Sequence, residues 1–413
     1  MGAFGRIWKK PSTKVALLAG LNQMSPVVLL PYVTIAFGVR ENSQFQIALS
    51  LAIIIQTLIS LGVEYQIPAA KNRTLIRRLL KKSVYSAIIV SLLYGILIFS
   101  ATFNSIDYID VLLGGLAIAL SSAFFSVANA LNIRDQNHLA LIASNAICAI
   151  TIILGQVICG IFWDNVYGLV IPIMIGRLLG GFSSLLSLRQ STRTIDGEDS
   201  NVKPSGGAEN TLWVLSFLVS TVALQLPVLI AGAAFESAQS AALAIALRIV
   251  SAPASLLGSG LAQGFMFDAS ERLRVSHKDF AQFVSSTQQR LTVISLTAGL
   301  ALGILAPVTI SLLFRDEWHA AGWMILVLAV PFTLQTVNRV LTPVFTMISS
   351  SGTLFTLQLC RIMALSIFMC VALMLQTGIN GMVFAIAIVS ILFQVSFSIT
   401  LRRKVNHDED FTD

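Results

Sequence analysis

A long series of apolar segments runs through the chain, and each is long enough to cross a lipid bilayer as a helix. A transmembrane helix needs about 20 mostly apolar residues, because the hydrocarbon layer is roughly 30 Å thick. The segments are continuous rather than strictly alternating, which favours helices over barrel strands. We predict twelve spans: 14–36, 46–67, 83–104, 110–131, 139–162, 166–187, 211–234, 241–267, 291–314, 323–348, 353–375 and 379–400.

The composition agrees with an all-α polytopic membrane protein. Hydrophobic residues make up 55% of the 413 residues and charged residues only 11%, whereas soluble domains carry roughly 25% charged residues. A net charge of +7 would be compatible with nucleic-acid binding. However, the basic residues are scattered among short loops and do not form a face, so we expect no nucleic-acid partner and a lipid bilayer as the surroundings.

Lysine and arginine residues concentrate on one side of the predicted membrane. One set of loops includes the run "KNRTLIRRLLKK" (71–82) and the basic tail, whereas the other set holds only Arg40 and Arg315. Because positive loops stay inside the cell, both termini should be cytoplasmic in a multi-pass protein of the inner membrane. We interpret the basic run as a cytoplasmic anchor in preference to a specific site for lipid head groups.

A polar stretch divides the spans into two groups of six. Residues 189–210 are rich in Gly, Ser and Asp, as in flexible linkers. We therefore predict an N-terminal half at 1–188, a cytoplasmic linker at 189–210, a C-terminal half at 211–400 and a cytoplasmic tail at 401–413. Repeated halves are common in transporters, so we expect the two halves to surround a central cavity.

Four arginines lie inside predicted spans, where a charge is costly and usually functional. They are Arg177, Arg248, Arg339 and Arg361, and the spans hold no deep acidic residue to pair with them. Each arginine could be structural, either bonding carbonyls freed by proline or extending to the interface. The alternative is an anionic guest, because the guanidinium fork suits phosphate. We predict that these four, with the intramembrane amides Gln225 and Asn22, bind substrate.

No motif for catalysis, nucleotide binding or metal binding is present. The four histidines fall in loops or in the tail, and the sequence has no P-loop, H-E-x-x-H, G-x-G-x-x-G or G-x-S-x-G pattern. The four cysteines lie inside apolar segments, so we expect small buried side chains instead of disulfides or a metal site. We therefore predict a protein that is not an enzyme and needs no cofactor.

Two stretches resemble one family of exporters. In "ALAIALRIVSAPASLLGSGLAQGF" (242–265) a run of small apolar residues leads to Arg248 and Pro253. In "LLFRDEWHAAGWMILVLAV" (312–330) a span end, a short loop with Trp318 and the next span follow one another. With the twelve spans in two halves, this resembles the multidrug/oligosaccharidyl-lipid/polysaccharide exporter superfamily, and within it the bacterial flippases for O-antigen and capsular polysaccharide.

The resemblance implies a substrate and a mechanism. The substrate would be a polyprenyl-diphosphate-linked oligosaccharide, carried from the inner to the outer leaflet by alternating access of the two halves. The arginines, Arg248 among them, would offset the charge of the diphosphate. A polysaccharide polymerase and a chain-length regulator are the partners that this implies, and surface polysaccharide (O-antigen, capsule or exopolysaccharide) would be the product of the pathway.

Other functions remain open at this point. A cation-coupled drug exporter of the same superfamily would share the architecture, although cationic drugs favour deep Asp or Glu residues, which are missing here. A membrane-embedded enzyme that modifies polysaccharide would need a large outer loop or a deep histidine, and we find neither. A scaffold would leave the four arginines unexplained.

Overall fold

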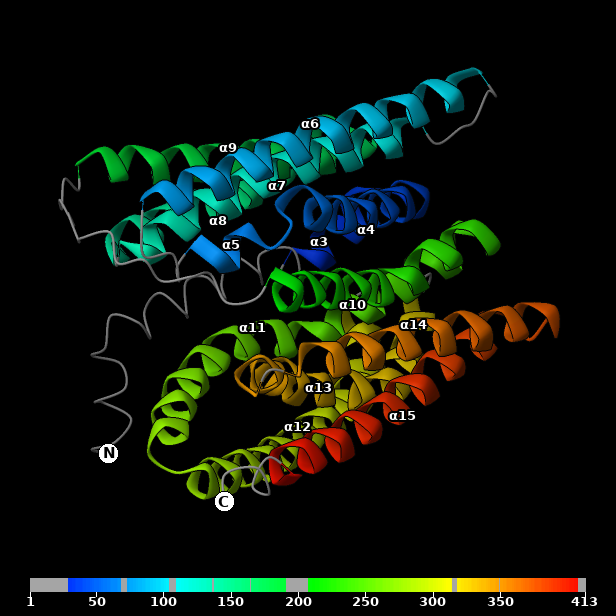
Figure 1. The fold of residues 1–413 in the computed structure, drawn as a ribbon. Coiled ribbons are helices and arrows are strands. Elements are labelled where there is room, and N and C mark those ends of the chain that lie inside the picture. The colour runs from blue at the N-terminus through cyan, green and yellow to red at the C-terminus, as the bar shows by residue number, and fades with distance from the viewer. Residues whose placement is uncertain are drawn as a thin grey trace, which may run out of the picture. The chain divides into compact units, whose positions relative to one another are not determined.

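The described part of the chain is helical throughout. The computed structural model describes residues 29–67, 73–103, 109–135, 137–163, 165–190, 207–313, 318–348 and 350–407. Its helices are α3 (Leu30–Ala36), α4 (Val39–Ser60), α5 (Val63–Gln66), α6 (Arg73–Phe103), α7 (Ile109–Arg134), α8 (His138–Phe162), α9 (Val166–Gln190), α10 (Gly207–Ala234), α11 (Ser237–Val275), α12 (His277–Leu313), α13 (His319–Met347), α14 (Ser351–Met374) and α15 (Gly378–His407). Figure 1 shows these helices in order along the chain.

Ten described helices are long and apolar enough to cross a membrane. They correspond to ten of the twelve predicted spans, which confirms an all-helical polytopic architecture. The first predicted span, 14–36, lies mostly outside the described residues. The eighth, 241–267, lies within the 39-residue helix α11, in which the apolar stretch Ser237–Ala252 is shorter than the other ten spans.

The chain divides into two compact units. Unit 1 comprises Met1–Pro204 with Val228–Gly232, and unit 2 comprises Ser205–Pro227 with Ala233–Asp413. The core of unit 1 is built by α3, α4, α7, α8 and α9, and large side chains such as Phe45, Ile118 and Leu169 lie fully buried there. Most of the predicted linker falls outside the described residues, so its flexibility and the domain bounds remain predictions.

Unit 2 has its own core, formed by α11 to α15. Phe280, Phe345 and Phe397 are fully buried in it, and the rings of Phe345 and Phe397 meet edge to face with centroids 5.4 Å apart. Helix α13 is central in this unit, since it packs against α11, α12 and α15. Residues projecting from α13 are therefore brought next to residues of several other helices.

Several helices extend beyond the apolar spans. The basic run 71–82 was expected to be a loop, but α6 already begins at Arg73 and continues without a break to Phe103. The reason is local, since Leu, Arg and Lys are among the better helix formers and no Gly or Pro interrupts the run. The positive charges of this run therefore project from a rigid helix.

Helix α4 ends in a tight turn that positions this part of unit 1. Leu61 has φ 46° and Gly62 has φ 69°, so both residues adopt the left-handed conformation that favours glycine. The chain reverses there and forms the short helix α5. The carbonyl oxygens of Leu58 and Ile59 near the end of α4 accept hydrogen bonds from Ser86 Oγ (2.7 Å) and Ser83 Oγ (3.3 Å) of α6.

Candidate functional site

The structure distributes the predicted site residues over both units. Arg177 lies on α9 in unit 1. Gln225, Arg248, Arg339 and Arg361 lie on α10, α11, α13 and α14 in unit 2. Asn22 lies outside the described residues. Of the six, Arg339 and Arg361 lie close enough to influence one another electrostatically.

Arg177 has a protein partner. It is half-buried on α9 and donates a hydrogen bond to Ser122 Oγ of α7. Further along the same helices, Asn129 Oδ1 accepts from Ser144 Oγ of α8 (2.8 Å) and from Ser184 Oγ of α9 (3.2 Å). These bonds join the three helices of unit 1, so Arg177 contributes to packing whatever else it does.

Arg361 occupies an unusual position for a charged side chain. The buried face of α14 contains Leu354, Gln358, Arg361, Leu365 and Met369, at the three- and four-residue spacing of one helix face. Arg361 is only 7% exposed and lies about halfway along the helix. Its guanidinium donates no hydrogen bond to any described residue. A buried guanidinium with five unused donors is costly in lipid and in protein alike.

Neighbours of Arg361 come from two other helices. Its guanidinium carbon lies 4.7 Å from the centroid of the Phe393 ring on α15, a cation–π contact. From α13, Arg339 lies near enough for the two positive charges to repel one another. Arg339 is exposed, whereas Arg361 is buried. Unit 2 therefore holds an accessible cation on α13 and a buried one on α14.

Buried amides on the same three helices are also unsatisfied. Each of their side chains is at most 7% exposed. The atoms without a hydrogen-bond partner are Gln335 Nε2, both polar atoms of Asn338, Gln358 Oε1 and both polar atoms of Gln394. A buried polar group without a partner costs roughly several kcal/mol in an apolar environment, so these atoms can form further hydrogen bonds. We call Gln335, Asn338, Arg339, Gln358, Arg361 and Gln394 the unit 2 polar cluster.

The three helices that carry these residues contain no acidic side chain of their own. Residues 319–407, which contain α13, α14 and α15 entirely, include no Asp and no Glu. Arg339 lies about 12 Å from the end of α13 at 1.5 Å rise per residue, inside the span His319–Phe345. The unit 2 polar cluster therefore combines two intramembrane cations with amide donors and acceptors, which is the chemistry of an anion site.

The other two predicted residues of unit 2 are less distinctive. Gln225 on α10 and Arg248 on α11 are both half-buried. Gln358 and Gln394, in contrast, were missed from the sequence. Gln358 could have been found, since it lies one turn before Arg361 on the same face. Gln394 stands alone in an apolar run, and only the packing of α15 shows where it lies.

The cysteines correct one expectation. All four are free, but only Cys148 is buried, whereas Cys360 and Cys370 are exposed on α14. They share the outward face of that helix with Met363 and Ile367, which are also exposed. A thiol on an apolar helix surface behaves as a small hydrophobe and needs no burial to be tolerated. Among the described residues, no group of three or more potential ligands could hold a metal ion.

Comparison with solved structures identifies the fold. No protein-family model matches the sequence. No curated protein matches it either. An inward-facing multidrug-resistance MATE transporter of the MOP superfamily aligns with a TM-score of 0.64 at 14% identity, covering 97% of this chain and 96% of the other. The lipid II flippase MurJ aligns with a TM-score of 0.61 at 13% identity, covering 95% and 88%.

The chain has this transporter fold. A eukaryotic MATE transporter shares it too, with a TM-score of 0.61 at 14% identity and 98% coverage of both chains. Together with the ten apolar helices, this shows a multi-pass membrane protein. At such low identity the likeness extends to the fold alone. Because drug transporters and a lipid flippase share it, the substrate must be inferred from the side chains.

Proposed function

We propose that the protein is a flippase for a polyprenyl-diphosphate-linked oligosaccharide, which it moves from the inner to the outer leaflet of the cytoplasmic membrane. The observation that carries the proposal is the unit 2 polar cluster. It holds two arginines and four incompletely bonded amides in a region of the chain without a single acidic residue.

The charge of the cluster selects the substrate class. An anion would gain the attraction of Arg339 and Arg361 and would relieve their mutual repulsion, whereas a cationic drug would add to it. Among anions, a diphosphate offers several acceptor oxygens to guanidinium donors, and bidentate pairing makes such contacts strong. Sugar hydroxyls both donate and accept, which matches the free atoms of Asn338 and Gln394.

Within this proposal the other predicted residues have supporting roles. Arg177, Arg248, Gln225 and Asn22 would bind the substrate at other points of its passage through a cavity between the halves. Both termini would be cytoplasmic, and the lipid-linked product would pass to a polymerase and a chain-length regulator for O-antigen, capsule or exopolysaccharide. The net work of export would be favourable, because moving one negative charge outward across 100 mV releases about 2.3 kcal/mol.

Transport in liposomes tests the proposal. The purified protein is reconstituted with a fluorescent polyprenyl-diphosphate-linked sugar, and an impermeant reductant measures the fraction in the outer leaflet over time. We expect wild type to equilibrate the lipid and Arg339→Gln and Arg361→Gln to slow it by about tenfold or more, as loss of a charge-assisted hydrogen bond implies. Arg403→Gln, which removes an exposed charge outside the cluster, is the matched control and should transport normally.

The second candidate is a cation-coupled drug exporter, favoured by the fold that MATE transporters share. The same liposomes distinguish it when they are loaded with a cationic dye and given a sodium or proton gradient. Dye movement driven by the gradient, together with no movement of the lipid-linked sugar, would overturn the flippase proposal. If Arg403→Gln slowed lipid transport as much as Arg339→Gln and Arg361→Gln do, the cluster would have no special role in transport.

A further inference from the structure

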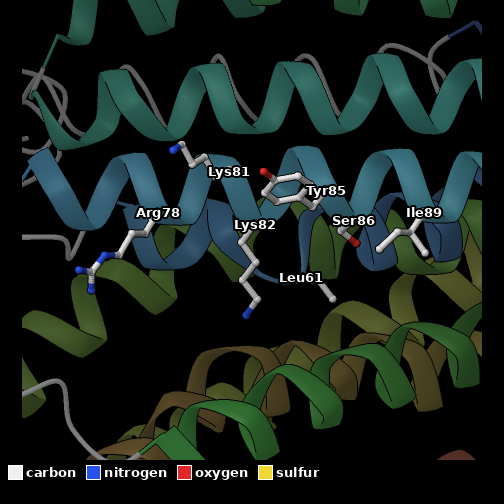
Figure 2. A pocket seen from close by; sticks show the side chains of 7 residues that line it. All are labelled: Leu61, Arg78, Lys81, Lys82, Tyr85, Ser86 and Ile89. Carbon is white, nitrogen blue, oxygen red and sulfur yellow. The ribbon is translucent and has the colours of Figure 1, made fainter.

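A pocket on unit 1 brings basic side chains together with apolar ones. It has a volume of about 520 Å³ and is lined by Leu61, Arg78, Lys81, Lys82, Tyr85, Ser86 and Ile89. All but Leu61 come from α6, where they recur every three or four residues and so share one side of the helix. Figure 2 shows the side chains of Arg78 and Lys82 leaving α6 on the same side, with Leu61 beside Lys82.

The cations of this pocket have no partner within the described residues. Arg78, Lys81 and Lys82 are exposed and form neither an ion pair nor a hydrogen bond there. The end of α4 does not need them either. A helix C-terminus usually attracts lysine or arginine, but Ser83 and Ser86 already bond the carbonyl oxygens of Ile59 and Leu58.

The nearby acidic residue does not neutralise them. Glu64 on α5 is held by a hydrogen bond from Ser60 Oγ (3.0 Å), and its second carboxylate oxygen is buried without a partner. Burial raises the pKa of the Glu64 carboxyl, which favours its uncharged form. Among the described residues, no carboxylate forms an ion pair with Arg78, Lys81 or Lys82.

An apolar surface continues from the pocket along the same helix. Only 6% of the α6 span is buried, the lowest share among the ten spans. Tyr85, Ile89, Leu92, Leu93 and Ile96 are each between 57% and 65% exposed. Cations at the start of a membrane helix, followed by an exposed apolar face, match a molecule with an anionic head and fatty-acid tails. A soluble anion would match only the first of these features.

We propose that this pocket binds the phosphate head group of an anionic phospholipid, with the acyl chains lying along α6. Arg78 and Lys82 hold the phosphate, Lys81 adds charge, and Tyr85 and Ile89 pack against the first carbons of the chains. The site differs from a general attraction of basic loops to an anionic membrane surface. It depends on particular cations that line the pocket and not on the number of charges in the run.

Lipid binding to the purified full chain in detergent tests this site. Native mass spectrometry would measure the dissociation constants of short-chain phosphatidylglycerol and phosphatidylcholine. We expect wild type to bind phosphatidylglycerol about tenfold more tightly, as one to two charge-assisted hydrogen bonds imply. Arg78→Gln with Lys82→Gln should abolish this preference, whereas Arg78→Lys with Lys82→Arg should largely keep it.

A control pair removes the same net charge elsewhere. Arg77 and Lys404 are exposed but do not line the pocket, so Arg77→Gln with Lys404→Gln should retain the preference for phosphatidylglycerol. If both double variants lost the preference for phosphatidylglycerol equally, the binding would depend on the overall positive charge and not on this pocket, and the proposed site would be wrong. A thermal unfolding curve checks the fold, and if the first double variant is unfolded, Lys82→Gln alone should weaken binding about threefold.

Glycerol phosphate distinguishes a lipid from a free phosphate ion. It carries the head-group charge without acyl chains, so we expect it to compete poorly at concentrations that match the lipid. Competition as strong as that of phosphatidylglycerol would overturn the lipid assignment. None of these measurements depends on transport, so they test the lipid site independently of the flippase proposal.

Discussion

Replacement of Arg361 by methionine should separate the charge of this residue from its volume. Methionine is apolar and flexible, so it can fill most of the space without leaving a cavity. In the wild type Arg361 is 7% exposed, its guanidinium carbon lies 4.7 Å from the centroid of the Phe393 ring, and the positive charge of Arg339 acts on it. The variant loses the cation–π contact but is relieved of the repulsion and of the burial of a charge.

The magnitudes favour a more stable variant. The cation–π contact contributes about 0.5–2 kcal/mol, whereas burying a cation costs several kcal/mol, roughly, even after the protein relaxes. Replacing buried charges by well-packed apolar residues is often neutral or stabilising by about 1–4 kcal/mol. We therefore expect Arg361→Met to raise the free energy of unfolding by an amount in this range while slowing lipid transport at least about tenfold.

The assay is a denaturant titration of the purified protein in detergent micelles, followed by helical circular dichroism. Leu365→Met, one turn further along the same buried face of α14, is the control for side-chain shape and should cost less than about 1.5 kcal/mol. A soluble diphosphate should stabilise wild type and leave Arg361→Met unchanged. If Arg361→Met instead lost several kcal/mol, a group of the protein itself would already neutralise the arginine, and the argument for an anionic guest would be refuted.

Three further predictions concern packing, protonation and topology. A Cβ at Gly180 would lie 2.8 Å from a backbone carbonyl oxygen of α8, so Gly180→Ala should destabilise the protein by about 1–3 kcal/mol. A Cβ at Gly95 would have no atom within 4 Å, so Gly95→Ala should be neutral or stabilising in the same unfolding titration. Burial raises the pKa of Glu64 above 4.5, so wild type should lose stability relative to Glu64→Gln as the pH rises above that value. If the difference in the free energy of unfolding between the two proteins stayed constant from about pH 4 to 8, this expectation would be wrong. Single cysteines introduced at 195–207 should react with an impermeant reagent only from the cytoplasmic side, and those at 316–320 only from outside; labelling of both from one face would refute the span count.

Hydropathy predicted the helices well because few backbone conformations are stable in a lipid bilayer. A segment in the bilayer must satisfy its backbone within itself, so an apolar run of sufficient length becomes a helix. The ends were harder to predict, since they lie in water, where the apolar signal stops but the helix need not. The basic run before residue 83 illustrates this, as α6 extends through it from Arg73.

The sequence places the four arginines within predicted spans but does not reveal their environments. Arg177 and Arg361 look alike in sequence, each a single charge within an apolar span. In the structure, Arg177 donates a hydrogen bond to Ser122, whereas Arg361 donates none to a described residue and lies over the ring of Phe393. The difference depends on contacts between helices far apart in the chain, which a single sequence does not contain.

Residues 319–407 contain no Asp and no Glu, and this composition bears on how the environment of Arg361 is interpreted. In an ordinary transmembrane bundle, a deep arginine faces a carboxylate or a set of carbonyl oxygens, and the protein bears no uncompensated charge. On α13 to α15 the chain offers no carboxylate, and it leaves Asn338, Gln358 and Gln394 with free hydrogen-bonding atoms around the same helices. In the proposed function, such an arrangement costs stability when no substrate is bound, and an anionic substrate restores that stability. Two expectations follow from the free-energy cost of burying this charge: Arg361→Met should be more stable than wild type, and it should transport the lipid more slowly.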